Sequence, residues 1–389
     1  MQTVATPFTD QDLRQLEAHG VSLEQAKQQL QYLRDGFAPL AVLRPCHLGY
    51  GIIKIDSDEE AELLALYEEA AAAGRLMKFV PASGAATRMV PEGGDAIPKA
   101  LIPFHKYPDE TRTALHEHLV EATHTVRDRN GLCRLHFTVR PDHREQIQQH
   151  IDLLLQQWKD DSSRFEIQLS EQDPATDTIA LTPTGELFHN DDGRLHLRPG
   201  GHGALLKNLE RAGGDIILIK NIDNVLPETR AQQMFHYKKL LVGTLLKQQA
   251  TESDRPVRVC GVVPNQGEPG GGPYWVRDSD GRESLQIVEA SQLSDHHLTE
   301  TATHFNPVDL VCGVRDKQGR PFLLTDFADP EAGLIVAKKY QGHDIRALEW
   351  PGLWNGGMAK WHTVFAEVPA ATFAPVKAPA DLQRPEHSV

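Results

Sequence analysis

The stretch from Phe79 to Met89 reads FVPASGAATRM, an apolar start followed by a loop of small residues. The apolar start predicts a buried strand, and the small residues after it permit a close approach of the backbone to a ligand. Backbone N–H groups at such a turn can bind anions, and Arg88 can pair with an oxyanion. An ordinary tight turn would look the same, so the surrounding sequence must distinguish a turn from an anion site.

Apolar runs and amphipathic runs alternate on both sides of this stretch. We predict strands at 77–82, 133–139, 164–170, 215–221 and 257–263, and helices at 112–128, 142–160, 203–212 and 229–249. Such alternation predicts an α/β fold in which helices flank a mostly parallel central sheet. Residues 1–75 are expected to form a helical N-terminal lead-in, and residues 76–389 one domain that ends in an α+β elaboration.

Composition narrows the classes of partner. The chain has 389 residues, 40% of them hydrophobic, and a net charge of −14. A protein that binds nucleic acid polymers usually has a basic surplus, so that partner is not expected. The four cysteines are scattered without a CxxC pair, and no apolar run approaches the roughly 18 residues of a membrane span. We expect a cytoplasmic protein without a membrane span, and composition leaves its oligomeric state open.

Three polar clusters follow predicted strands: Ser83 to Arg88, the run that begins at Gln172, and Asn221 to Asn224 around Asp223. In parallel α/β sheets, ligands bind outside the carboxyl ends of the strands. The three clusters therefore predict one crevice, although loops are polar in most proteins. Asp223 is either a turn cap or a hard oxygen ligand for Mg²⁺. The hydrolase signatures GxSxG and HExxH are missing.

Several runs, taken in order, resemble the nucleotidyltransferases of the UDP-sugar pyrophosphorylase type. They are PASGAATRM at 81–89, PKALIPF at 98–104, PGGHG at 199–203, Asp223-Asn224, EPGGGPYWV at 268–276 with QIVEASQL at 286–293, HFNPVDL at 304–310 and TFAPVKAPADL at 372–382. The runs VPASGAATRM, PGGHGALL, FNPVDL and PGLWNGGMA also resemble a bacterial family of unknown function.

The resemblance implies a GT-A-like fold and a reaction. A nucleoside triphosphate, with UTP favoured, would be joined to a sugar 1-phosphate, and pyrophosphate would be released. Arg88, Lys99 and Lys377 would be catalytic, and Asp223 would hold Mg²⁺. The nucleotide would lie against Ser83, Gly84, Ala85, Ala86, Thr87, Gln172, Gly201 and His202. The sugar would lie against Gly270, Gly271, Gly272, Glu289 and Asn306.

The sequence departs from the family pattern at two loop positions, where Ser83 and Ala86 replace glycines. A Cβ at position 86 disfavours a positive φ and would narrow the approach to phosphates. Two further functions therefore stay open: an inactive nucleotide- or sugar-nucleotide-binding module, and a glycosyltransferase on the same fold. The Asp278-Ser279-Asp280 run could serve a glycosyltransferase as a metal motif, but its context is typical of a turn.

Overall fold

A nine-stranded sheet forms the centre of the computed structural model, which describes residues 7–90, 93–251, 254–267, 270–305 and 308–389. Its strands, in spatial order, are β2 (His47–Leu48), β3 (Gly51–Ile53), β18 (His362–Glu367), β12 (Val257–Val262), β15 (Asp309–Gly313), β11 (Ile216–Ile219), β4 (Leu76–Pro81), β7 (Leu132–Val139) and β8 (Arg164–Glu171). Every neighbouring pair is parallel except the two that involve β15. The predicted mostly parallel α/β sheet is confirmed.

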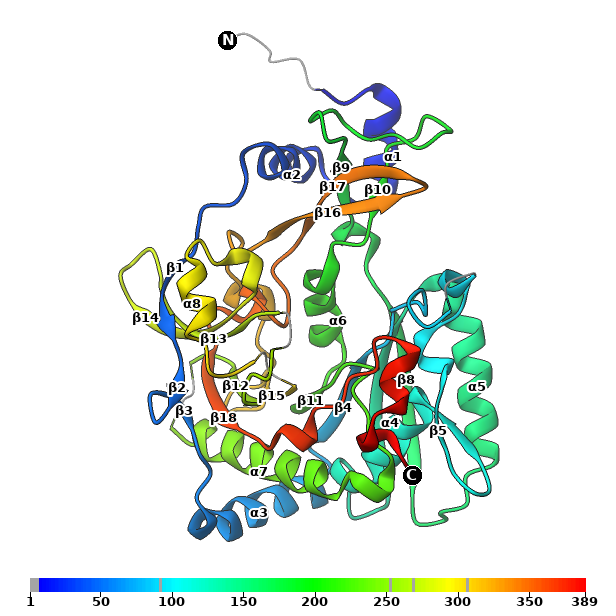
Figure 1. Ribbon diagram of the computed structural model, residues 1–389, viewed down its shortest axis with the longest axis vertical. Helices are drawn as coiled ribbons and strands as arrows, with labels where there is room; N and C mark the ends of the chain where they lie inside the picture. The colour runs from blue at the N-terminus through cyan, green and yellow to red at the C-terminus, as the bar shows by residue number, and fades with distance from the viewer. Residues whose placement is uncertain (1–6, 91–92, 252–253, 268–269, 306–307) are drawn as a thin grey trace.

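Helices cover both faces of this sheet because its central strands are apolar on both sides. In β4, Leu76 and Val80 pack into one hydrophobic cluster, and Met77 and Phe79 pack into the other. The first cluster includes residues of α3 (Ser57–Ala72), α4 (Ala114–Thr125), α5 (Arg144–Gln156) and α7 (Gln232–Gln249). The second includes residues of α6 (Leu205–Arg211). Helix α3 lies beside α7 (Figure 1).

Three smaller sheets complete the fold. A four-stranded sheet has the order β10 (Leu197–Arg198), β9 (Thr178–Leu181), β17 (His343–Glu349) and β16 (Leu334–Tyr340). A three-stranded sheet contains β1 (Ala41–Pro45), β13 (Gly272–Arg277) and β14 (Glu283–Val288), next to α8 (His296–Glu300). A two-stranded sheet pairs β5 (Pro103–Lys106) with β6 (Thr111–Thr113).

The N-terminal segment is distributed over several of these parts. Helices α1 (Asp10–His19) and α2 (Leu23–Asp35) form a cluster with the four-stranded sheet, as Figure 1 also shows at the top of the molecule. Strand β1 pairs with β13, and β2 and β3 extend the central sheet. These strands were not predicted, because all three are short and the partners of β1 and β3 lie far away in sequence. The domain division at residue 75 stays a prediction.

The described residues contain no helix long and apolar enough to cross a membrane. All four cysteines are buried free thiols, as expected for Cys133, Cys260 and Cys312 from their apolar surroundings.

A buried network of charged side chains joins α4, α7 and three strands or strand ends. Its members, each at most 5% exposed, are Lys78, Glu121, Lys220, Lys238 and Asp309. The Lys78 Nζ lies 2.8 Å from the Glu121 carboxylate, and Lys238 Nζ lies 2.9 Å from Asp309. Lys238 also contacts Glu121. Three ammonium groups thus share two carboxylates, and burial lowers the pKa of Lys78 to about 7.

This network predicts a pH dependence of the folding free energy. The folded-state pKa of Lys78, about 7, lies below its ordinary value of 10.5. Between these values the unfolded chain binds more protons, so this group makes stability rise with pH across that window, by at most about 1.4 kcal/mol per pH unit. Urea unfolding of the wild type and Lys78→Met at pH 7 to 10 measures this contribution. Identical slopes for both proteins would contradict it.

Candidate functional site

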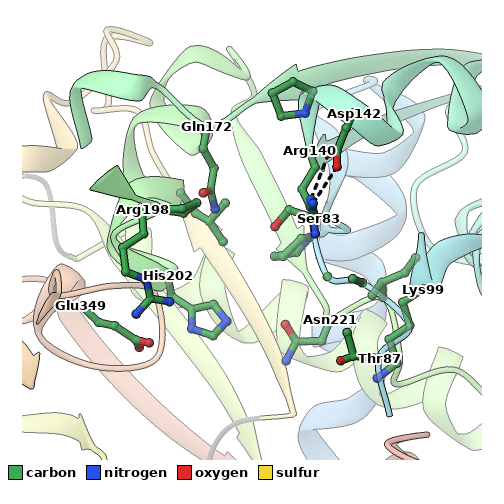
Figure 2. A pocket seen from close by; sticks show the side chains of 18 of the residues that line it. Ser83, Thr87, Lys99, Arg140, Asp142, Gln172, Arg198, His202, Asn221 and Glu349 are labelled. Carbon is green, nitrogen blue, oxygen red and sulfur yellow. Dashed lines mark hydrogen bonds and ion pairs between the residues drawn. The ribbon is translucent and has the colours of Figure 1, made fainter. Parts of the chain in front are cut away.

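A cavity of about 1060 Å³ lies at the carboxyl ends of β4, β8 and β11. Parallel α/β sheets bind ligands at this edge. Eleven of the predicted site residues line the cavity, some of which Figure 2 shows: Ser83, Gly84, Ala85, Thr87, Arg88, Lys99, Gln172, Gly201, His202, Asp223 and Lys377. Residues up to 294 positions apart in the chain therefore meet at one place, as the three strand-end clusters suggested.

Asp223 stands at the centre of the charged part of the site. It follows β11 and is 7% exposed. Its Oδ2 accepts hydrogen bonds from the Nζ of Lys99 at 2.7 Å and the Nζ of Lys377 at 2.8 Å. Burial acts to raise the pKa of Asp223, but the two lysines outweigh burial and hold that pKa below its ordinary value. The carboxylate is therefore ionised at neutral pH.

Lys377 reaches the site because the C-terminal segment is hydrogen-bonded to the loop after β11. The Val376 N–H donates to the Asp223 carbonyl at 2.9 Å, and the Ala374 N–H donates to Asn224 Oδ1 at 3.0 Å. Asp381 accepts the N–H of Lys377 at 2.7 Å. These bonds fix the backbone around Lys377, although its side chain is half exposed.

The surroundings of Asp223 fit a magnesium ion that is held mainly by a ligand. Its buried Oδ1 has no hydrogen-bond partner within the described chain. Among all the residues that the structure describes, there is no group of three or more His, Cys, Asp or Glu side chains that could hold a metal ion. Mg²⁺ often binds through one or two carboxylates, substrate phosphates and waters. Asp223 can therefore supply one oxygen, and substrate phosphates would have to supply others.

The loop after β4 faces the cavity with one exception. Ser83, Gly84, Ala85, Thr87 and Arg88 line it. The side chain of Ala86 is 1% exposed and belongs to the hydrophobic core, and its N–H donates to the Ile97 carbonyl at 2.9 Å. Its φ is not positive. The expectation that the Ala86 methyl narrows the approach to phosphates is wrong, because this methyl points into the core, and its occupied N–H does not favour the predicted nucleotide contact.

The glycine-rich run at 199–203 packs against Trp350 at the other side of the cavity. A Cβ at Gly200 would come within 2.4 Å of the Trp350 ring, and one at Gly203 within 2.2 Å of Trp350 Cβ. The close packing explains the glycines and sets the position of His202, whose ring lies edge-on to Trp354 at 5.3 Å. His202 is accessible from the cavity, yet the surrounding protein displaces water and lowers its pKa, so the ring is uncharged at neutral pH.

The residues predicted to bind the sugar lie elsewhere. Gly270, Gly271 and Gly272 lead into β13, and Glu289 follows β14. A Cβ at Gly271 would come within 2.0 Å of the Val288 carbonyl, so this glycine allows two backbone segments to pack. Asn306 lies outside the described residues. None of the other four is among the described residues that line the cavity, and their role in sugar binding stays a prediction.

Sequence reasoning missed several residues that line the cavity. Arg140 follows β7 and pairs with Asp142, with N–O distances of 3.0 and 2.6 Å; the strand-end rule could have identified both. Arg198 directly precedes the glycine-rich run, which was a usable signal. Glu349 ends β17, and nothing local in the sequence marks it.

Comparisons with known proteins agree with this architecture. A family model described as Domain of unknown function (DUF4301) matches residues 9–92, 94–253 and 249–388. UDP-N-acetylglucosamine pyrophosphorylase from Trypanosoma brucei is similar in structure, with 15% identity, a TM-score of 0.62, and coverage of 96% of this chain and 81% of that chain. A mutant UDP-glucose pyrophosphorylase from Leishmania major in complex with UDP-glucose is also similar, with 15% identity and a TM-score of 0.56. The match covers 95% of this chain and 77% of that chain. A comparison of this sequence with curated proteins finds no match. The likeness confirms the predicted nucleotidyltransferase fold.

Proposed function

We propose that this chain, which belongs to the family described as Domain of unknown function (DUF4301), is a nucleotidyltransferase. It would join a nucleoside triphosphate, with UTP favoured, to a sugar 1-phosphate and release pyrophosphate. One observation carries the proposal: Lys99 and Lys377 converge on the buried carboxylate of Asp223 beside the small-residue loop after β4. Two cations and an anion at one strand edge suit a ligand that carries both phosphates and a metal ion.

The proposed reaction is a single displacement at phosphorus. An oxygen of the sugar phosphate attacks the α-phosphorus of the triphosphate, and an oxygen–phosphorus bond forms. The bond between the α-phosphorus and the oxygen that bridges to the β-phosphorus breaks, and its electron pair leaves with pyrophosphate. This step needs no covalent enzyme intermediate and no general base, because the attacking phosphate oxygen is already ionised. The protein contributes positioning and charge neutralisation.

Each charged residue has a role in this scheme. Arg88 and Lys99 would stabilise the charge on the departing pyrophosphate, and Lys377 would neutralise the attacking sugar phosphate. Asp223 would hold Mg²⁺, and a bound Mg²⁺ would neutralise negative charge on the phosphate oxygens. Loop N–H groups of Ser83 to Ala85 and Thr87 would hold phosphates.

The proposal also assigns residues to the nucleoside of the triphosphate and to the sugar. Gln172, Gly201 and His202 would contact the nucleotide. Gly270 to Gly272, Glu289 and Asn306 would contact the sugar. The support for these roles is the order of the motifs in the sequence.

The proposal is tested by pyrophosphate release from the four common nucleoside triphosphates with a panel of sugar 1-phosphates and Mg²⁺. Release that requires both substrates supports it. No release with any pair would reject the enzymatic function. Calorimetric binding of UTP without turnover would instead identify a nucleotide-binding module, and transfer of sugar from a nucleotide sugar to an acceptor would identify a glycosyltransferase.

Arg88→Ala gives a mutational test of the loop. Arg88 is exposed to the cavity, so its loss should leave the fold intact. We expect kcat for pyrophosphate release to fall about 100-fold, as when one donor to a developing oxyanion is removed. Arg282→Ala is the control, because this exposed arginine lies in a turn outside the cavity lining. Equal rates for the two variants would remove Arg88 from the proposed machinery.

A further inference from the structure

Arg198 is a further cationic residue that lines the cavity, on the side opposite the proposed phosphate site. Arg198 ends the short strand β10, where it pairs with Thr178 of β9. Figure 2 shows Arg198, His202 and Glu349 on one side of the cavity, and Ser83, Thr87 and Lys99 on the other. The proposed roles of the phosphate-binding residues do not use Arg198.

Arg198 has no ion-pair partner among the described residues. Its Nη1 is buried and finds no hydrogen-bond partner in the part of the chain that the structure describes. The charge of Glu349 acts on Arg198, but Glu349 forms its ion pair with Lys338, at 3.4 Å. The neighbouring His196 and His202 are uncharged at neutral pH, because burial lowers the pKa of each. A guanidinium remains protonated in proteins, so one positive charge faces the cavity.

The backbone that carries Arg198 is held by hydrogen bonds and by close packing. The Trp350 N–H donates to the Gly200 carbonyl at 2.8 Å, and Trp350 Nε1 donates to the Thr176 carbonyl at 3.1 Å. Two residues before Arg198, the His196 Nδ1 donates to Asn190 Oδ1 at 2.9 Å. The backbone of Arg198 is therefore fixed, and its guanidinium can bind an oxyanion through two parallel hydrogen bonds.

The position of this charge indicates which substrate it serves. A common nucleoside triphosphate carries its negative charge on the triphosphate alone, and the proposed function places the triphosphate against Arg88 and Lys99. The base and the ribose, which the proposed function places against the neighbouring Gly201 and His202, carry no negative charge. An oxyanion bound at Arg198 would therefore belong to the other substrate. We propose that Arg198 forms a second oxyanion subsite, which binds a carboxylate or a second phosphate on the sugar 1-phosphate. This inference rests on the proposed nucleotidyltransferase function and narrows its substrate class to acidic sugar phosphates.

The test compares glucose 1-phosphate, glucuronic acid 1-phosphate and glucose 1,6-bisphosphate as partners of UTP in pyrophosphate release. We expect wild-type kcat/KM to favour one of the two acidic compounds, and which one is favoured distinguishes a carboxylate from a phosphate. Arg198→Met should reduce this preference about 10- to 100-fold, the effect of losing a hydrogen bond to a charged group. Arg198→Lys should retain part of the preference, and Glu349→Gln should increase it by removing a nearby negative charge.

Arg140→Met is the matched comparison, because Arg140 lines the same cavity but is already neutralised by Asp142. It should not change the preference for the acidic compound. Turnover of glucose 1-phosphate with an unchanged preference in Arg198→Met would overturn the inference and leave the proposed function standing. If no sugar phosphate supports release, the proposed function fails. Calorimetric titration of glucuronic acid 1-phosphate and glucose 1,6-bisphosphate would then test Arg198 alone, and equal affinities in wild type and Arg198→Met for both compounds would overturn the inference.

Discussion

Replacing Lys377 with alanine is expected to lower kcat for pyrophosphate release by about 100- to 1,000-fold, the range found when one donor to a transition-state oxyanion is removed. Lys377 lies 2.8 Å from Asp223 and is the only proposed cation that comes from the C-terminal segment. In the proposed reaction its ammonium brings the sugar phosphate, an anion, to a triphosphate that is also an anion. Without it, the repulsion between the two substrates is left uncompensated at the moment of attack.

Lys339→Ala is the control for this loss of charge. Lys339 lies on β16 with its side chain 78% exposed, and its contact with Asp344 is at 4.0 Å. Its replacement should change kcat by less than about twofold, since exposed ion pairs contribute little. Both variants should keep the wild-type unfolding transition, because the Lys377 side chain is half exposed and its backbone contacts are retained. A Lys377→Ala enzyme as fast as Lys339→Ala would exclude Lys377 from the chemistry.

Replacing Glu121 with glutamine is expected to cost about 3–5 kcal/mol of folding free energy, as when one partner is removed from a buried ion pair. Glu121 lies within 3.6 Å of the ammonium groups of Lys78 and Lys220 and also contacts Lys238. Burial acts to raise the pKa of Glu121, but these three lysines outweigh it and hold the pKa well below its ordinary value. Without this carboxylate, Asp309 is the carboxylate left in this network, beside Lys220 and Lys238.

Urea unfolding followed by circular dichroism measures the loss. Glu62→Gln is the control, because Glu62 contacts Lys247 at 3.3 Å on the surface and its side chain is 59% exposed. That substitution should cost no more than about 1 kcal/mol. The double variant Glu121→Gln with Lys78→Met should recover part of the stability, since it also removes one unpaired ammonium. Equal stabilities of Glu121→Gln and Glu62→Gln would show that Glu121 does not stabilise the buried network.

The predicted crevice agrees with the structure because a local pattern marks each strand end. The apolar runs before Ser83, Gln172 and Asn221 are periodic features of neighbouring residues, and parallel strands bring their carboxyl ends to one edge. The cavity accordingly lies at these three ends. Arg140 follows a fourth such end and could have been identified by the same rule.

The same reasoning failed where the direction of a side chain decides its role. Ala86 was read as part of the phosphate loop, yet its methyl packs into the core and its N–H bonds to Ile97. Composition cannot distinguish a small residue that faces a ligand from one that faces the core. The three strands between residues 41 and 53 were missed for a related reason. Strands of two to five residues show little periodicity, and β1 and β3 pair with strands that are distant in sequence.

Local sequence alone was sufficient for the α/β class, for the loop after Phe79 and for Asp223 as a candidate, whereas Lys99 and Lys377 were chosen from the family resemblance. It could not show that the two lysines meet on one carboxylate oxygen, 124 and 154 residues away from it in the chain. It also could not show that the Nη1 of Arg198 has no hydrogen-bond partner among the described residues, or that five charged residues gather in the core. Periodicity and turn chemistry act between near neighbours, whereas these juxtapositions arise when the packing of the whole chain closes the sheet edge around them.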